Sequence, residues 1–251
     1  MDNPERGQVA AIIVAGGEGK RMGEPRPKQF IELGGRPLLT MTLLAFEKAR
    51  AVDTIFVVVP RGYEEYCWEK AIRPYGLKRV TGVVPGGGLR QESVRFGLEA
   101  AKGKCKIVVV HDGVRPFVSP DLIDRAVEAA RVHRAVITAL PAIDTLKAVD
   151  PSGMVKATLD REKVWMVQTP QVFYYKDLVQ AHQEAVDQGW TGASDDSLLL
   201  ERLGIPVKVL KGSVRNFKIT TQEDLEIARA MLEAFHKYYK SNDPRARKDP
   251  K

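Results

Sequence analysis

An apolar, β-branched run near the start of the chain passes directly into a loop rich in glycine. The run Val9–Val14 contains no charged residue, which is typical of a strand buried on both faces of a mostly parallel sheet. The loop that follows holds Gly16, Gly17 and Gly19 within four positions. In open α/β sheets such loops lie at the carboxyl ends of the strands, where ligands bind. This stretch therefore predicts an α/β fold with a binding site beside its first strand.

Basic residues follow the glycine loop, and together with it they indicate an anion-binding site. Backbone N–H groups of glycines approach a phosphate closely, and Arg21 and Lys28 would add full positive charges. The stretch lacks the Lys-Ser/Thr pair of the Walker motif, and Arg21-Met22 stands where a dinucleotide fingerprint has its third glycine. We predict a triphosphate-binding loop; a plain turn with solvated Lys and Arg side chains is the alternative.

Strand-like runs alternate with helical patterns along the rest of the chain. The predicted strands are Val9–Val14, Thr54–Val59, Arg79–Val84, Lys106–His111, Ala135–Leu140 and Pro206–Leu210. The predicted helices are Leu39–Ala49, Glu64–Ile72, Gln91–Ala101, Pro120–Arg134, Ser197–Leu203 and a last one from about Gln222 to Tyr238. This alternation predicts one α/β domain over residues 1–239, with a mostly parallel, Rossmann-like sheet and helices on both faces.

The segment Asp144–Asp160 interrupts this alternation. It consists of two short strand-like runs about a turn at Asp150–Gly153. An isolated two-stranded hairpin is only marginally stable in water, so its apolar side chains need a surface to pack on. We predict an inserted β-hairpin arm at about residues 144–163, which packs either on its own domain or on a second subunit.

The overall composition excludes several classes of protein. With 44% hydrophobic and 28% charged residues among 251, the chain has the composition of a soluble globular protein. No apolar run reaches membrane-spanning length and the first residues show no signal-peptide core, so we expect a cytoplasmic protein that does not bind membranes. Cys67 and Cys105 lack the spacing of a metal site and are expected to be reduced thiols.

The net charge of +7 suits a polyanionic small substrate. A nucleic-acid-binding protein would show a basic stripe with interleaved aromatic residues, whereas the basic C-terminal segment has only Tyr238 and Tyr239. We therefore predict no nucleic-acid partner, and a solvated, disordered tail over residues 240–251. A dinucleotide-dependent reductase would carry an acidic residue at the end of its second strand, and Val57–Pro60 contains none.

Other polar segments follow predicted strands. Pro85–Ser93 is a second glycine turn, which suits contacts to a base or ribose or else a flexible loop. Asp112, at the end of the fourth strand, is placed to bind ribose hydroxyls or a Mg²⁺–phosphate complex, unless it only pairs with Arg115. Ser194–Ser197 is acidic and hydroxyl-rich, and a plain helix N-terminus explains it equally well. Lys218 taken alone is typical of a solvated strand residue.

Taken in order, these segments form a known pattern, which closely resembles that of the 2-C-methyl-D-erythritol 4-phosphate cytidylyltransferases of the non-mevalonate isoprenoid pathway. The resemblance runs from about Val9 to the final helix. It is carried by Ala15–Met22, Lys28-Gln29, Gly86–Ser93, His111–Pro116, Asp144-Thr145, Asp160-Arg161, Thr169–Gln171 and Asn216–Lys218.

Two departures from the family pattern concern specificity. The first loop begins Ala15-Gly16-Gly17 where Ala-Ala-Gly is common, and a related family of pentitol-phosphate cytidylyltransferases also favours Ala-Gly-Gly. A pentitol phosphate such as ribitol 5-phosphate is therefore the alternative acceptor. Gly88 stands where some members have an Asp near the cytosine, so backbone groups must make that contact here.

The resemblance implies a CTP-dependent nucleotidyltransferase that uses Mg²⁺ or another divalent cation, works as a homodimer and transfers CMP from CTP to a sugar-alcohol phosphate. Its nucleotide site would comprise Ala15, Gly16, Gly17, Gly19, Gly87, Gly88, Ser93 and Asp112, with Mg²⁺ held mainly by the triphosphate and possibly by Asp112. The acceptor would contact Arg115, Thr145, Arg161, Thr169 and Lys218, and the catalytic cations would be Arg21, Lys28, Arg161 and Lys218.

The resemblance further implies that Thr145 and Arg161 reach the active site of the partner subunit from the arm. We do not expect His111 to act as a general base. A phosphate monoester has its second pKa near ~6, so it is already largely dianionic at neutral pH and needs no deprotonation before it attacks. His111 is instead expected to hold the loop that follows its strand.

Overall fold

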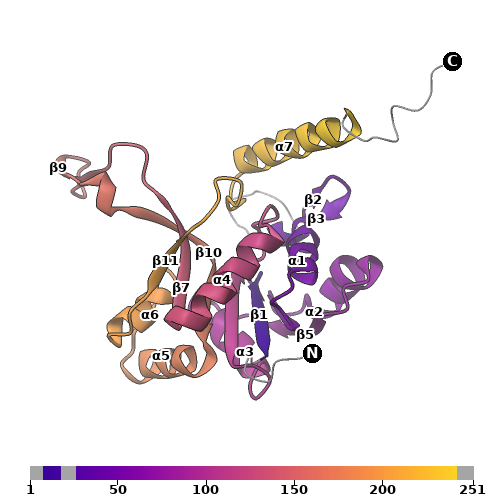
Figure 1. Ribbon diagram of the computed structural model, residues 1–251, viewed down its shortest axis with the longest axis horizontal. Helices are drawn as coiled ribbons and strands as arrows, with labels where there is room; N and C mark the ends of the chain where they lie inside the picture. The colour runs from indigo at the N-terminus through magenta and orange to yellow at the C-terminus, as the bar shows by residue number, and fades with distance from the viewer. Residues whose placement is uncertain (1–7, 18–26, 242–251) are drawn as a thin grey trace.

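The computed structural model describes residues 8–17 and 27–241, and side chains up to residue 234. A seven-stranded sheet has the order β11-β7-β10-β6-β1-β4-β5, with every strand parallel except β10. Its strands are β1 (Val9–Val14), β4 (Thr54–Val59), β5 (Val80–Pro85), β6 (Ile107–Asp112), β7 (Ala135–Pro141), β10 (Trp165–Tyr174) and β11 (Lys208–Lys211). The predicted mostly parallel α/β fold is confirmed, and the glycine loop follows a central strand (Figure 1).

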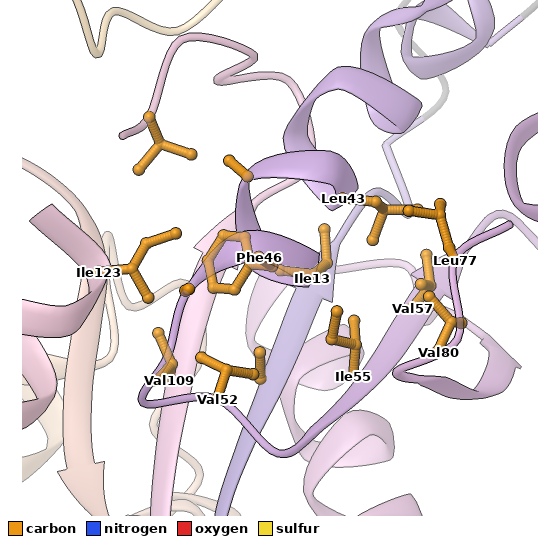
Figure 2. Packing of buried hydrophobic residues seen from close by; sticks show 14 of the residues in the cluster. Ile13, Leu43, Phe46, Val52, Ile55, Val57, Leu77, Val80, Val109 and Ile123 are labelled. Atoms are coloured by element: carbon orange, nitrogen blue, oxygen red, sulfur yellow. The ribbon is translucent and has the colours of Figure 1, made fainter. Parts of the chain in front are cut away.

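Successive residues of the central strand point to opposite faces of the sheet, and each face is covered by helices. Ile13 packs under α1 (Leu38–Lys48) and α4 (Pro120–His133), in the cluster around Phe46 that Figure 2 shows. The residue before it, Ile12, packs on the other face against helices α3 (Arg90–Ala100), α5 (Tyr175–Asp187) and α6 (Ser197–Arg202). Burial on both faces explains why the strand is apolar at every position.

Two parts of the fold differ from the sequence prediction. Only Lys163–Val167 is strand-like in the sequence, yet β10 continues to Tyr174 and runs antiparallel between β6 and β7. The centre of β10 contains the polar residues Gln168 and Gln171, which are buried. These residues interrupt the apolar pattern by which a buried strand is predicted. Helix α5 was missed although it buries Leu178, Ala181 and Ala185 at helical spacing.

The remaining elements lie at the edges. Residues Glu64–Ile72 form a short helix α2 (Glu64–Cys67) that continues as a wider turn (Trp68–Ile72), followed by a 3₁₀ turn at Arg73–Tyr75. A small hairpin, β2 (Glu32–Leu33) with β3 (Arg36–Pro37), packs with the start of α7 (Gln222–Ser241). The predicted last helix is thus confirmed and is slightly longer than expected. Within the described residues, no helix is long and apolar enough to cross a membrane.

The predicted hairpin arm is present and extends away from the sheet (Figure 1). Its strands β8 (Lys147–Val149) and β9 (Val155–Thr158) pair antiparallel, and a 3₁₀ turn at Arg161–Lys163 leads back into β10. Apolar arm side chains lie exposed in the single chain: Val149, Met154, Val155 and Leu159. The hairpin therefore does not bury its apolar side chains on its own domain.

Candidate active site

A cavity of about 160 Å³ lies at the carboxyl edge of the sheet, beside the loops that follow β1, β5 and β6. It brings together nine residues predicted for the site: Ala15, Gly16, Gly17, Lys28, Gly87, Gly88, Ser93, Asp112 and Lys218. Gly19 and Arg21, also predicted for this site, lie outside the residues that the structure describes, as does the chain beyond Ser241. The carboxyl ends of parallel strands share one sheet edge, which explains why segments far apart in sequence meet here.

Ser93 ties the two glycine loops together. Its Oγ accepts a hydrogen bond from the Gly87 N–H (3.2 Å) and donates one to the Leu89 carbonyl (3.2 Å). A Cβ added to Gly16 would lie 3.0 Å from this oxygen, and one added to Gly86 would lie 2.9 Å away. The loops of β1 and β5 thus approach each other closely over the hydroxyl, and glycine leaves the most room there. The buried Ser93 therefore holds the loop of β5 where it meets the loop of β1 at the cavity.

Asp112 ends β6 among three basic side chains. Its Oδ2 lies 3.1 Å from Arg115 Nε and 3.2 Å from Lys218 Nζ, and its Oδ1 lies 3.7 Å from Arg90 Nε. Burial of Asp112 opposes ionisation, but Lys218, Arg90 and Arg115 outweigh it and hold the pKa of the carboxyl well below its usual range. The predicted Asp112–Arg115 ion pair exists, and it belongs to a larger charge cluster that faces the cavity.

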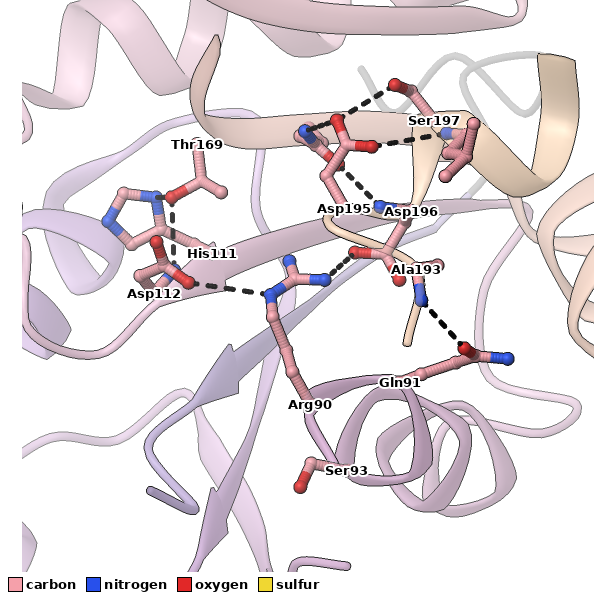
Figure 3. Close-up of polar contacts among 12 residues, drawn as sticks. Arg90, Gln91, Ser93, His111, Asp112, Thr169, Ala193, Asp195, Asp196 and Ser197 are labelled. Carbon is pink, nitrogen blue, oxygen red and sulfur yellow. Dashed lines mark hydrogen bonds and ion pairs between the residues drawn. The ribbon is translucent and has the colours of Figure 1, made fainter. Parts of the chain in front are cut away.

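Arg90 joins this cluster to a second buried carboxylate (Figure 3). Its NH1 lies 2.8 Å from Asp196 Oδ2, and Asp196 Oδ1 lies 3.2 Å from His182 Nε2. Burial opposes charge on Asp196, yet Arg90 and His182 keep the pKa of this carboxyl below its usual value. Sequence reasoning did not select Arg90, Asp196 or His182 as site residues, although Ser194–Ser197 was marked as acidic and hydroxyl-rich.

A larger cavity, of about 420 Å³, adjoins the first, since Arg90, Asp112 and Lys218 line both. It also contains the predicted acceptor residues Arg115 and Thr169. Its far side carries acidic and hydroxyl groups from the Ser194–Ser197 loop and the helix that follows: Ser194, Asp195, Ser197 and Glu201. The arrangement offers an anion site beside the glycine loops and, next to it, a polar chamber with room for a hydroxylated molecule.

His111 is fully buried behind Asp112 rather than exposed to either cavity. Its ring lies against Phe46, with 5.0 Å between ring centroids. Burial, assisted by the charges of Arg115 and Lys218, lowers the pKa of His111 to about 3, so the ring is neutral at physiological pH. This supports the prediction that His111 holds the local structure.

Comparisons with known proteins agree with this geometry. The family model described as "IspD: 2-C-methyl-D-erythritol 4-phosphate cytidylyltransferase" matches residues 9–234. This chain belongs to the 2-C-methyl-D-erythritol 4-phosphate cytidylyltransferase family. It is 44% identical to the cytidylyltransferase of that name from Syntrophus aciditrophicus, over 90% of this chain and 96% of the relative. It is 45% identical to the one from Alkaliphilus metalliredigens, over 90% and 93%.

Solved structures with the same fold come from the same family. The 4-diphosphocytidyl-2C-methyl-D-erythritol synthase of Anaerococcus prevotii superimposes with a TM-score of 0.81 at 35% identity, over 91% of this chain and 97% of that one. The 2-C-methyl-D-erythritol 4-phosphate cytidylyltransferase of Thermus thermophilus gives a TM-score of 0.73 at 38% identity, over 90% and 99%. The Rossmann-like fold is therefore that of solved cytidylyltransferases.

Among the residues that the structure describes, the two predicted site residues that line neither cavity lie on the arm. Thr145 and Arg161 are exposed, and neither lines the cavities described above. Arg161 donates a hydrogen bond from NH1 to the Ile143 carbonyl of the same chain (2.9 Å). A single chain therefore does not bring these two residues to the site.

The described residues contain no group of three or more His, Cys, Asp or Glu side chains that would hold a metal ion alone. Of the described residues that line the smaller cavity, only Asp112 is acidic. Mg²⁺ in nucleotide-binding proteins is commonly bound by one or two carboxylates together with substrate phosphates. The donor set of this family member fits that mode of binding.

Proposed function

We propose that the protein transfers CMP from CTP to 2-C-methyl-D-erythritol 4-phosphate, which yields 4-diphosphocytidyl-2-C-methyl-D-erythritol and pyrophosphate. The observation that carries this proposal is the junction of the two cavities at Asp112, Lys218 and Arg90. The smaller cavity, between the glycine loops, suits phosphate groups of the nucleotide, and the larger one has room for a polyol phosphate. Membership of the family supports methylerythritol phosphate over the alternative, a pentitol phosphate.

In this reaction an oxygen of the acceptor phosphate attacks the α-phosphorus of CTP. A new P–O bond forms as the bond to the bridging oxygen breaks, and pyrophosphate leaves. No proton has to be removed from the nucleophile, because it is already anionic. The difficulty is to bring two polyanions together and to stabilise the charge on the transferring phosphoryl group, which fixed cations do through position and electrostatics.

The basic residues of the site have distinct parts in this mechanism. Lys28, together with Arg21, contacts the triphosphate in the transition state. Lys218, which is half-buried beside Asp112, contacts the acceptor phosphate from the same chain. Arg115 is held by the Asp112 carboxylate and by the Asn216 carbonyl (2.8 Å), so it lines the acceptor cavity in a fixed orientation.

We further propose Mg²⁺ as the cofactor. Asp112 would hold it together with the phosphates of CTP, and the ion would neutralise charge on the triphosphate. The three cations around Asp112 keep its carboxyl ionised, which a metal ligand requires. The cytoplasmic location proposed from the sequence is compatible with the two unpaired cysteines.

We propose a two-fold symmetric homodimer in which each arm delivers Arg161 and Thr145 to the acceptor phosphate bound by its partner. Exposed apolar side chains on the arm support this, since two short strands have no core of their own. A guanidinium also binds a phosphate in two places at once, which gives Arg161 a chemical role there.

The test is a pyrophosphate-release assay with CTP and Mg²⁺, in which methylerythritol phosphate, ribitol phosphate and ribulose phosphate are compared at equal concentrations. We expect kcat/KM to be highest, by at least about tenfold, for methylerythritol phosphate. A higher kcat/KM with ribitol phosphate would mean that the acceptor is a pentitol phosphate, while the reaction is still CMP transfer from CTP. No pyrophosphate from CTP with any of the three acceptors would overturn the proposed function.

A further inference from the structure

Asp196 is a buried carboxylate that touches neither cavity, yet it binds a residue that lines both. The residue is 1% exposed and is absent from the walls of the two cavities. It forms an ion pair with Arg90 at 2.8 Å. Arg90 is therefore the cationic link between the Asp196 carboxylate and the two cavities.

Two further contacts fix Asp196, and a third fixes its neighbour Asp195. Its Oδ1 lies 3.2 Å from His182 Nε2, and its backbone N–H donates to Gln171 Oε1 (3.2 Å). The same Gln171 donates from Nε2 to Asp195 Oδ2 (2.7 Å), so the loop is bonded at two successive residues. Helix α5 thus contacts the carboxylate, and strand β10 fixes the backbone that carries it. A carboxylate held in this way is a rigid anchor for its cation.

Arg90 lies between two carboxylates at unequal distances (Figure 3). It is 2.8 Å from Asp196 but 3.7 Å from Asp112, which is beyond hydrogen-bonding range. Asp112 already has Lys218 and Arg115 within 3.2 Å. Because Asp196 holds the guanidinium, the Oδ1 side of Asp112 has no hydrogen bond from Arg90 and stays available to a ligand.

We propose that Asp196 is a positioning residue, which anchors Arg90 at the junction of the two cavities and keeps it from closing onto Asp112. This inference rests on the proposed function, since Asp112 is there assigned to the Mg²⁺ ion that binds with the phosphates of CTP. Without the anchor, Arg90 would turn to Asp112, the nearest remaining carboxylate, and form a paired, hydrogen-bonded contact with it. The nucleotide would then have to displace Arg90 before it binds.

The first test is Asp196→Asn, which removes the charge and nearly preserves the shape. We expect KM for CTP to rise by about tenfold or more, in line with the loss of one charge-assisted contact, and KM for the acceptor to change by less than about twofold. The Kd of CTP measured by calorimetry should rise by the same factor. This binding measurement needs no turnover, so it separates failure of this inference from failure of the proposed function.

Asp177→Asn is the matched control. Asp177 is also a buried acid on an arginine, with 2.8 Å to Arg134, but it lies at the start of α5 and lines neither cavity. We expect this variant to lose stability and to keep the KM for CTP of the wild type. An equal rise of KM in both variants would mean that loss of any buried acid paired with an arginine has this effect, and would overturn the proposal.

A double-mutant comparison tests whether Asp196 acts through Arg90. If it does, Asp196→Asn adds less than about twofold to the KM for CTP of Arg90→Met, because the residue it anchors is already gone. Effects that multiply would contradict the proposal. If Asp196→Asn does not fold, Arg90→Lys is the substitute test. Lysine keeps the positive charge but lacks the planar guanidinium, whose N–H groups can contact two carboxylates. It should raise KM for CTP, and an unchanged KM would overturn the proposal.

Discussion

The Thr169 hydroxyl lies 3.0 Å from Nδ1 of His111, and it also accepts a hydrogen bond from the Asp112 N–H (3.1 Å). A hydroxyl can donate and accept, so Thr169 binds the ring nitrogen and the Asp112 backbone at the same time. Burial keeps the ring neutral at physiological pH. This contact joins strand β10 to the end of β6, and it fixes the backbone that presents the Asp112 carboxylate to the cavities.

The first prediction concerns the pH dependence of turnover. The acid limb of kcat/KM should follow ionisation of the acceptor phosphate near pH ~6. His111→Gln should keep this limb, because the histidine is not the base and a glutamine amide can both donate to and accept from Thr169. The measurement is kcat/KM between pH 5 and 8 for both proteins. An acid limb that disappears in the variant would assign base catalysis to His111.

The second prediction concerns stability in mild acid. His111 has a pKa of about 3 in the folded protein and 6.5 as its ordinary value, so the unfolded state binds more protons between these pH values. Stability must then fall as the pH drops below 6.5, by about 2 kcal/mol between pH 7 and pH 5 from this residue. Urea unfolding should show a smaller fall over this range in His111→Gln. An equal fall would mean that His111 titrates normally.

The third prediction concerns Asp112→Asn. Loss of the carboxylate leaves Lys218, Arg90 and Arg115 without their shared anion, and the nucleotide without its predicted carboxylate contact. We expect KM for CTP to rise by at least about tenfold, and by more than KM for the acceptor. Asp121→Asn, at an exposed acid on α4, is the control and should behave as the wild type. A change confined to the acceptor KM would contradict the assignment of Asp112 to the nucleotide.

The fourth prediction concerns the cations of the first loop. Lys28 lies in the 3₁₀ turn Lys28–Phe30 and lines the smaller cavity. Lys28→Ala should lower kcat by at least about a hundredfold without unfolding the protein, as expected for the loss of a cation that stabilises the transition state. Arg21→Ala should do the same. Lys48→Ala, at the exposed end of α1, is the control. Normal turnover would remove the residue concerned from the mechanism.

The fifth prediction concerns the arm. If Arg161 serves the site of the partner subunit, Arg161→Ala should raise the acceptor KM. A mixture of Arg161→Ala and Lys28→Ala proteins should regain activity, because mixed dimers contain one site with both native residues. Each variant alone is the control, and subunit exchange is verified by mass spectrometry of tagged chains. Exchanged dimers that stay inactive, or a fully active monomer, would refute delivery between subunits.

Local sequence patterns determined most of the sheet. Six of its strands follow from apolar runs such as Val9–Val14, since a strand buried on both faces must be apolar along its whole length. The loops at their carboxyl ends were also predictable, because parallel strands place those ends at one edge. Gly16, Lys28, Asp112 and Lys218 consequently meet in one cavity, as the sequence predicts.

Tertiary structure alone decided which polar residues pair behind that edge. The polar centre of β10 gives no strand pattern, and only its insertion between β6 and β7 satisfies its backbone and brings Thr169 to His111. The pairing of Arg90 with Asp196 depends on how helices α3 and α6 pack on the same face of the sheet. The spacing of residues in the sequence does not predict such a contact. Two charged side chains form a buried ion pair only when packing places them together and excludes water from both.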